Sequence, residues 1–471
     1  MRASPRATVL LLLFTQAART TRAFRHHSRV RTAHRRVSRL PPLHSSTAAP
    51  APEPALVKLR SKRQIAAFGL PISFLFLSNF ALGAVDTAAV ARCGGLLDLA
   101  ALAPGTAAME YSCYVLSALT SIIFNRLASV PLDGPVDDPS SRPRRDFWDA
   151  ELSPGLGLAA LVGLAHAAVF LACAESIALL CGAPPALSGR AALYLRWRAL
   201  GAATFQYQSV SSSAFYATKD SATPFRATAV AVVVNVVGDA LLCPRWGLAG
   251  AAAATSAAQV SSCAYLRRRL VKAGLAPQSG SPVVVPSRAK ARELLTETLP
   301  HGVVCASRTA FYFLLGRWCC QLGVVASAAQ QITSTVFWGS SSASAEPMSV
   351  AAQTFVPEQT VLIRAAANNN NNNNNGDGNA DDDDGSTRRG VATAVSRLVT
   401  VLRRLFVVSL LWGAGVTGVV WAVLRPGFVA RLSPNPAVSA EIPRLPLYVI
   451  SLTIAPMLLS EGAMLGKAGN C

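Results

Sequence analysis

The most constraining feature of this chain is its succession of long apolar segments. About ten runs of roughly 20 residues carry few charges, and an α-helix needs this length to cross a bilayer. Lipid offers no partner to unpaired backbone groups, and the chain lacks the alternating ten-residue pattern of membrane barrels, so the segments are predicted to be helices. The predicted spans are 65–91, 99–125, 155–183, 193–217, 225–243, 247–266, 299–318, 324–345, 398–424 and 445–465.

Composition supports an all-α integral membrane protein. Hydrophobic residues make up 51% of the chain and charged residues 14%, and the mean hydropathy is +0.36, values that exclude an ordinary soluble domain of this size. The net charge of +20 does not indicate a nucleic-acid partner, because the excess lies in a leader and in loops. If every predicted span crosses, the basic segments 58–63, 142–145, 219–226, 267–292 and 388–389 share one side, the cytoplasm-equivalent one.

The first 52 residues are predicted to be a targeting leader. A short apolar core is followed by basic sequence with no acidic residue before Glu53, which resembles the bipartite plastid leaders of algae with complex plastids. A plain secretory signal or a mispredicted first exon are the alternatives. The leader favours a plastid envelope membrane as the location.

Polar side chains inside the apolar spans point to function. Asn235 and Asp239 are four residues apart in the stretch 224–260, so they share one helix face. Asp86 lies in the first span. An ionisable residue at the centre of a membrane helix costs roughly 2.5 to 3.5 kcal/mol. We therefore expect these residues to form part of a transport site.

Four segments together resemble the multidrug and toxic compound extrusion (MATE) transporters, and among them the DinF-like group that includes plant plastid members. They are GLPISFLFLSNFALGAVDTAAVAR, LDLAALAPGTAAMEYSCYVLSALTSIIFNRLAS, YLRWRALGAATFQYQSVSSSAFYATKDSATPF, and NVVGD followed by GLAGAAAATSAAQ. VASAAQQI, residues 353–357 and APMLLSEGAMLG fit the second half more loosely.

The resemblance implies a two-lobed bundle of six plus six helices. An amino-terminal lobe is predicted over 64–270, a basic inter-lobe loop over 271–298, and a carboxyl-terminal lobe over 299–471. The family pattern continues for two more helices, so this lobe is expected to be incomplete. A low-complexity Asn/Asp insert over 365–390 is predicted to be a flexible loop.

The resemblance also implies an ion-coupled antiporter that exports a small organic solute, with H+ or Na+ as the coupling ion and no cofactor. The implied ion-coupling residues are Asp86, Asn235 and Asp239, any of which could hold Na+, together with Asn125 and Thr255. The residues leave plainer roles open: a helix cap for Asp86, an interfacial position for Asp239, a structural role for Asn125 and a backbone bond for Thr255.

Other polar residues receive secondary assignments. Gln206 and Tyr207 are predicted to line a substrate path. Arg198 and Arg226 are expected to extend to the membrane interfaces.

Two other functions compete with the antiporter. A lipid-linked saccharide flippase of the same superfamily would need cationic residues inside the cavity, whereas Lys and Arg lie mainly in loops here. A shortened chain without transport activity is the second. The sequence contains no phosphate-binding loop, metalloprotease motif or nucleophile elbow, so it gives no indication of an enzyme. The ten Cys residues lack the spacing of metal ligands. A monomer in contact with lipid is expected.

Overall fold

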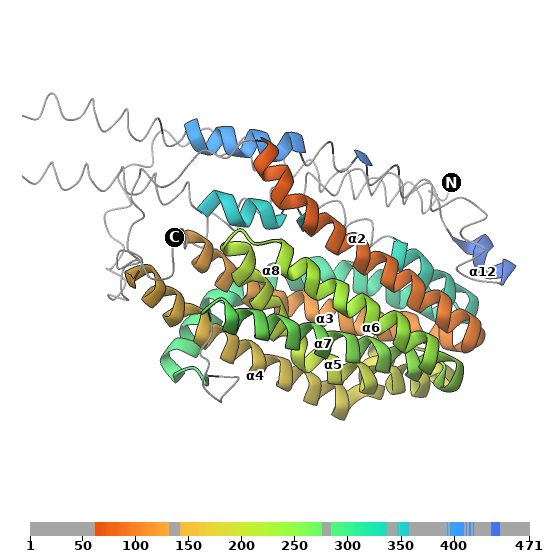
Figure 1. Ribbon diagram of the computed structural model, residues 1–471. Coiled ribbons are helices and arrows are strands. Elements are labelled where there is room, and N and C mark those ends of the chain that lie inside the picture. Colours follow the sequence, from red (N-terminus) through yellow and green to blue (C-terminus); the bar gives the residue numbers. More distant parts are fainter. Residues whose placement is uncertain are drawn as a thin grey trace, which may run out of the picture. The chain divides into compact units, whose positions relative to one another are not determined.

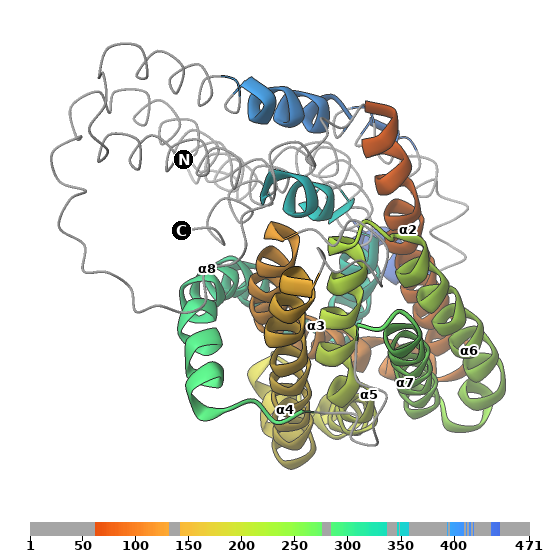
Figure 2. The ribbon, with the colours of Figure 1, turned by 60° about the vertical axis from the view of Figure 1, so that its left-hand side comes forward.

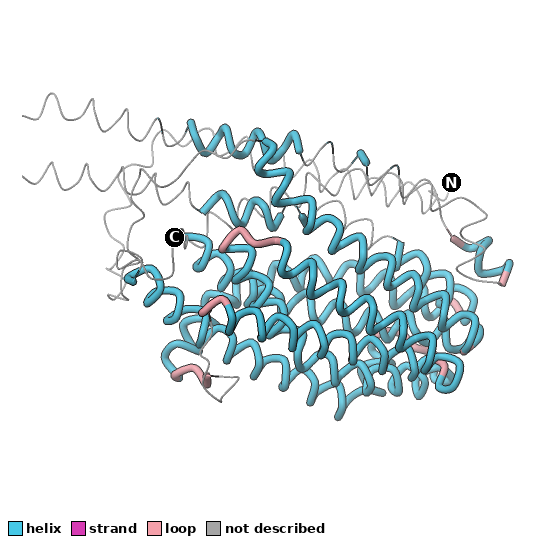
Figure 3. The backbone as a smooth tube through the Cα atoms, viewed as in Figure 1, coloured by secondary structure: helices cyan, strands magenta, loops and turns pink. Residues whose placement is uncertain are grey.

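The computed structural model describes residues 62–130, 142–275 and 284–336, with shorter pieces within 346–357 and 393–442. These residues form helices and no strand (Figure 3). The helices are α2 (Lys62–Cys93), α3 (Gly95–Ser129), α4 (Arg142–Leu180), α5 (Pro185–Ala217), α6 (Ala222–Trp246), α7 (Leu248–Lys272), α8 (Arg288–Gln321) and the short α12 (Pro436–Glu441). Residues 324–336 and 396–408 are also helical. The predicted leader, the Asn/Asp insert and the span 445–465 lie outside the described residues.

The all-α membrane fold is confirmed. Each of the seven predicted spans between 65 and 318 falls largely within one helix, from α2 to α8. Among the residues that the structure describes, four helical stretches are able to cross a membrane by length and apolar composition alone: Ala67–Cys93, Gly95–Ser129, Arg145–Leu180 and Ala222–Trp246.

The predicted loop over 271–298 is wrong in its second part, because α8 begins at Arg288. The Ser287 side chain caps this helix by accepting a hydrogen bond from the Lys290 backbone N–H at 3.2 Å. A Ser cap satisfies one of the free N–H groups of a first helical turn. The basic stretch is therefore partly a helical extension.

Tight turns connect most neighbouring helices, so these helices run antiparallel. α4 packs along α5, α6 packs along α7, and α2 lies beside α6 (Figures 1 and 2). We call the end where α3, α5 and α7 finish and α8 starts the basic end, and the opposite end the far end. Gly247 makes the turn between α6 and α7 with a φ of 53°, a conformation that suits glycine.

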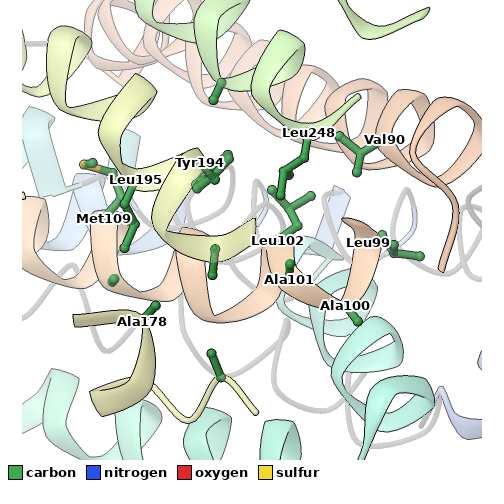
Figure 4. Close-up of a cluster of buried hydrophobic side chains, with 14 of the residues drawn as sticks. Val90, Leu99, Ala100, Ala101, Leu102, Met109, Ala178, Tyr194, Leu195 and Leu248 are labelled. Carbon is green, nitrogen blue, oxygen red and sulfur yellow. The ribbon is translucent and has the colours of Figure 1, made fainter. Parts of the chain in front are cut away.

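Each end of the bundle has its own apolar core. Leu99, Leu195 and Leu248 belong to the far-end cluster (Figure 4), and Trp148 and Leu266 belong to the basic-end cluster. The Trp148 indole N–H also donates to the Val130 carbonyl at 2.7 Å, which joins the start of α4 to the end of α3.

Asp98 fixes three helices relative to one another at the far end. Its carboxylate forms an ion pair with Arg190 of α5. It also accepts a hydrogen bond at 3.2 Å from the N–H of Leu248, the first residue of α7. A carboxylate is favourable there because the first N–H groups of a helix lack partners and carry the positive end of its dipole. α3, α5 and α7 are thereby held in a defined register.

Candidate functional site

Side chains from three helices meet at one level inside the amino-terminal half. Asp86 lies seven residues before Cys93, the end of α2; Asp239 lies seven before Trp246, the end of α6; and Thr255 lies seven after Leu248, the start of α7. At 1.5 Å per residue these positions are each about 10 Å from the far end. Because α6 packs against both α2 and α7, the three side chains come together.

Asn235 joins the two carboxyl groups. Its side-chain nitrogen donates to Asp86 Oδ1 at 2.6 Å and to Asp239 Oδ2 at 3.0 Å, so the amide uses both of its N–H groups. Asn235 is fully buried and Asp239 is 3% exposed. We call Asp86, Asn235, Asp239 and Thr255 the carboxylate cluster. The four-residue spacing of Asn235 and Asp239 on α6 places both on the face that meets α2.

The remaining contacts of the cluster involve its oxygen atoms. The Asp86 and Asp239 carboxyl groups share the Asn235 amide and interact electrostatically, and two ionised carboxylates so placed repel each other. Thr255 Oγ1 lies 3.3 Å from Asp86 Oδ2 while it donates to the Ala251 carbonyl at 2.8 Å. Asn235 Oδ1 is buried with no hydrogen-bond partner among the described residues. The cluster therefore offers two acidic groups and neutral oxygens.

Other metal chemistry has no comparable support. Within the described part of the chain, no group of three or more His, Cys, Asp and Glu side chains is arranged to hold a metal ion. The carboxylate cluster has two such residues, Asp86 and Asp239.

Three predicted site residues lie apart from the cluster. Asn125 is buried four residues before the end of α3, at the basic end. Tyr207 packs in the basic-end core and contacts Arg267 through its hydroxyl. Gln206 is fully buried in α5, and neither of its side-chain polar atoms has a partner among the described residues. The structure thus brings together four of the predicted residues and leaves these three elsewhere.

Arg198 was expected at an interface, and that prediction is wrong. It lies in the interior of α5, 8% exposed, and interacts electrostatically with Asp86 on α2 and Glu110 on α3. Tyr194 is its hydrogen-bond partner, whereas its Nε and Nη1 have none among the described residues. Arg226, by contrast, is exposed. A buried guanidinium thus stands beside the carboxylate cluster.

The close approach of α6 and α7 holds the cluster together. A Cβ added at Gly238 would lie 2.7 Å from the Cβ of Ala254, a separation too small for two carbon atoms. These residues precede Asp239 and Thr255 directly, and small residues at such a crossing allow the helix backbones to approach closely.

We expect Gly238→Ala to weaken any ion-dependent activity more than it weakens the fold. The added methyl group must push α6 from α7 and so move Asp239 from its partners. Overpacking of this kind costs about 1 to 3 kcal/mol. The measurement is ion-dependent protection against thermal unfolding in detergent. Gly302→Ala is the matched control, because its nearest neighbour, Ala118 Cβ, is 3.9 Å away; equal ion-dependent protection in both variants would contradict the expectation.

Comparisons with known proteins identify the family. A family model described as lipid II flippase MurJ matches residues 72–311, just over half of the 471-residue chain. The solved structure of a MATE transporter in complex with MaL6 is 16% identical, with a TM-score of 0.59 over 87% of this chain and 85% of that chain. The multidrug transporter DinF-BH in complex with R6G gives the same identity, TM-score and coverage.

The chain belongs to the family that the lipid II flippase MurJ model describes, and its fold is that of the MATE transporters. A MOP superfamily transporter from Pyrococcus furiosus is 15% identical with a TM-score of 0.59, over 87% of this chain and 85% of that one. The chain is also 26% identical over 309 residues to Protein DETOXIFICATION 47, chloroplastic, of Arabidopsis thaliana. The alignment covers 63% of this chain and about half, 53%, of that relative.

Proposed function

We propose that this protein is a MATE-type antiporter that exports small organic solutes, driven by H+ or Na+ binding at the carboxylate cluster. The observation that carries the proposal is the Asn235 amide, which bridges Asp86 and Asp239 inside the amino-terminal half. Buried carboxyl groups inside membrane helices are costly and mark ion pathways. A neutral bridge also keeps both acidic groups available to a cation.

The cluster can respond to an ion gradient in either of two ways. A proton shared by Asp86 and Asp239 would remove the repulsion between them. Na+ would do the same and would use the carboxylate oxygens, Asn235 Oδ1 and the Thr255 hydroxyl as ligands. In both cases the bound cation removes one of the two negative charges of the cluster, which then tolerates a dry environment better than the doubly charged cluster. Ion binding therefore changes the relative stability of closed and open conformations.

Reconstitution into proteoliposomes tests the proposal. We expect efflux of an organic dye to follow an imposed pH or Na+ gradient, and the ion that works identifies the coupling ion. The control uses the same vesicles with the gradient collapsed by an ionophore. Dye movement that is equal with and without every gradient would refute ion coupling.

A second candidate is a flippase for a lipid-linked saccharide. The MurJ match and the buried Arg198 favour it, because a pyrophosphate-linked substrate needs a cation inside the protein. Against it, Glu110 and Asp86 surround the same guanidinium with negative charge. Translocation of a fluorescent lipid-linked oligosaccharide without dye efflux would select the flippase.

The location and assembly complete the proposal. The acid-free basic leader and the chloroplastic relative support a plastid envelope membrane, and we propose that the transporter acts there as a monomer. Residues 1–60 fused to a fluorescent reporter should enter the plastid. Secretion of the reporter to the cell surface would contradict this location.

A further inference from the structure

A set of five charged residues at the basic end connects the two halves of the chain. Arg126 of α3 bonds Glu151 of α4 at 2.7 Å, and its second terminal nitrogen bonds Glu293 and Glu297 of α8 at 2.6 Å each. Lys290 of α8 bonds Glu151 at 2.6 Å and Glu293 at 3.2 Å. We call these residues the basic-end ion network. It links α3 and α4 to α8, the first helix of the carboxyl-terminal half.

We propose that the basic-end ion network is a latch that closes the transporter toward the basic face, with Arg126 as its central positioning residue. The proposal rests on the transport function proposed above, in which the two halves move apart on alternate sides. Opening at the basic face would require Arg126 to leave Glu293 and Glu297, and Lys290 to leave Glu151.

The connectivity suits a contact that breaks and re-forms. When α8 moves away, Arg126 keeps Glu151, which belongs to the same half. Lys290 keeps Glu293, which lies three residues further along α8. Glu297 loses Arg126, but its side chain is 48% exposed and water can solvate it. The less exposed charges each keep a partner, which avoids the high cost of an unpaired buried charge.

Exposure also favours reversible opening. The side chains of Arg126 and Glu151 are 14% and 10% exposed, whereas those of Glu293 and Glu297 are 36% and 48% exposed. The partners on α8 are therefore already hydrated in part. Arg126 and Lys290 lower the pKa of Glu293 despite the opposing effect of its burial, so Glu293 stays charged at neutral pH.

Contacts toward the far end have a different chemistry. The Thr106 hydroxyl of α3 donates to Gln331 Oε1 at 2.8 Å, and the Gln331 amide donates to the Thr87 hydroxyl of α2 at 3.4 Å. Gln331 lies in the helical stretch 324–336. These neutral bonds also join the two halves, but dissolved salt does not screen them as it screens charges. The two faces should therefore differ in their response to ionic strength.

Spin-label distances in the full-length protein in lipid nanodiscs test the latch. Labels at Asp149→Cys and Arg292→Cys report on the basic end, and labels at Leu97→Cys and Leu322→Cys report on the far end; all four positions are exposed. The background replaces the exposed Cys93 and Cys173 with Ser. We expect Arg126→Gln to shift the basic-end distances to longer values without lengthening the far-end distances. High salt should have the same effect on the protein with the unaltered network.

Matched variants separate a latch from a general loss of stability. Arg126→Lys should restore part of the short-distance population. Arg190→Gln breaks the Asp98 ion pair, which lies within the amino-terminal half, and should leave the basic-end distances unchanged. Thr106→Val should lengthen the far-end distances at every salt concentration. Should Arg126→Gln fail to fold, Glu297→Gln at the exposed edge replaces it.

The distance measurement needs neither a coupling ion nor a substrate. Absent gradient-driven efflux together with salt-sensitive basic-end distances would reject the antiporter and retain the latch. Basic-end distances that ignore both salt and the network substitutions, in folded protein, would overturn the latch.

Discussion

Asp86→Asn and Asp239→Asn are each expected to lower gradient-driven export at least about tenfold. Each substitution keeps the size and shape of the side chain but removes one of the two acidic groups that Asn235 bridges. Loss of one charged partner costs roughly 1.5 to 3 kcal/mol, and 1.4 kcal/mol corresponds to a factor of ten. The measurement is initial efflux from proteoliposomes that contain equal amounts of protein, with the gradient-independent leak subtracted.

A charge control and a double variant sharpen this prediction. Asp149→Asn removes a carboxylate that is exposed near the start of α4, and it should leave efflux unchanged. If Asp86 and Asp239 hold one ion together, the double Asn variant should be little worse than either single variant, because residues that act on one ligand are not additive. Unaltered export in both single variants would refute the coupling role of the cluster.

The sequence contains enough information to predict most of the carboxylate cluster. Asn235 and Asp239 share a face because four residues make about one helical turn. The short turns at Gly94 and Gly247 then place Asp86 and Thr255 at the same depth. Asn125 has no neighbouring turn that would place it at the depth of the cluster. It lies near the end of α3 and therefore at the basic end. The resemblance to the family groups Asn125 with the carboxylate cluster, whereas the bounds of α3 place Asn125 apart from the cluster.

The basic-end ion network does not follow from the loop predicted over 271–298, because residues 288–298 are helical. The sequence holds a helical signal there. Lys290, Glu293 and Glu297 follow one another at spacings of three and four residues, so they share one helix face, and Ser287 precedes them as a cap. Recognition of that pattern would have extended α8 toward Arg126. The partner itself lies 167 residues from Glu293 in sequence, and only tertiary packing brings it there.

Arg198 illustrates a different limit. Arg196 and Arg198 stand two residues apart in α5, so they lie on different faces, and Arg196 is exposed whereas Arg198 is buried. Arg198 follows Tyr194 by four residues, on the face that holds the far-end core. The assumption that every arginine in a membrane helix lies at an interface ignores the helix face on which the arginine stands. The buried position becomes intelligible once Asp86 and Glu110 are found nearby.

Arg198→Met is expected to change ion dependence strongly. Two nitrogens of the guanidinium have no partner among the described residues, but its charge interacts with Asp86 and Glu110, so its removal leaves these carboxyl groups without a cation and should also lower stability. The same positive charge opposes a cation at Asp86. A nearby unit charge changes such an equilibrium by about tenfold or more, so we expect the ion concentration for half-maximal export to fall about tenfold.

Maximal export should fall in the same variant, because an ion that binds more tightly leaves more slowly. Arg196→Met is the matched control, since it removes an exposed arginine from the same helix, and it should leave both quantities unchanged. The measurements are efflux as a function of ion concentration and thermal unfolding in detergent. If Arg198→Met unfolds at a lower temperature and keeps the ion dependence of the unsubstituted protein, Arg198 supports packing of α5 and does not tune the carboxylate cluster. Tighter ion binding in a folded Arg198→Met protein would instead mean that the buried arginine keeps ion binding at the cluster weak enough for release in every transport cycle.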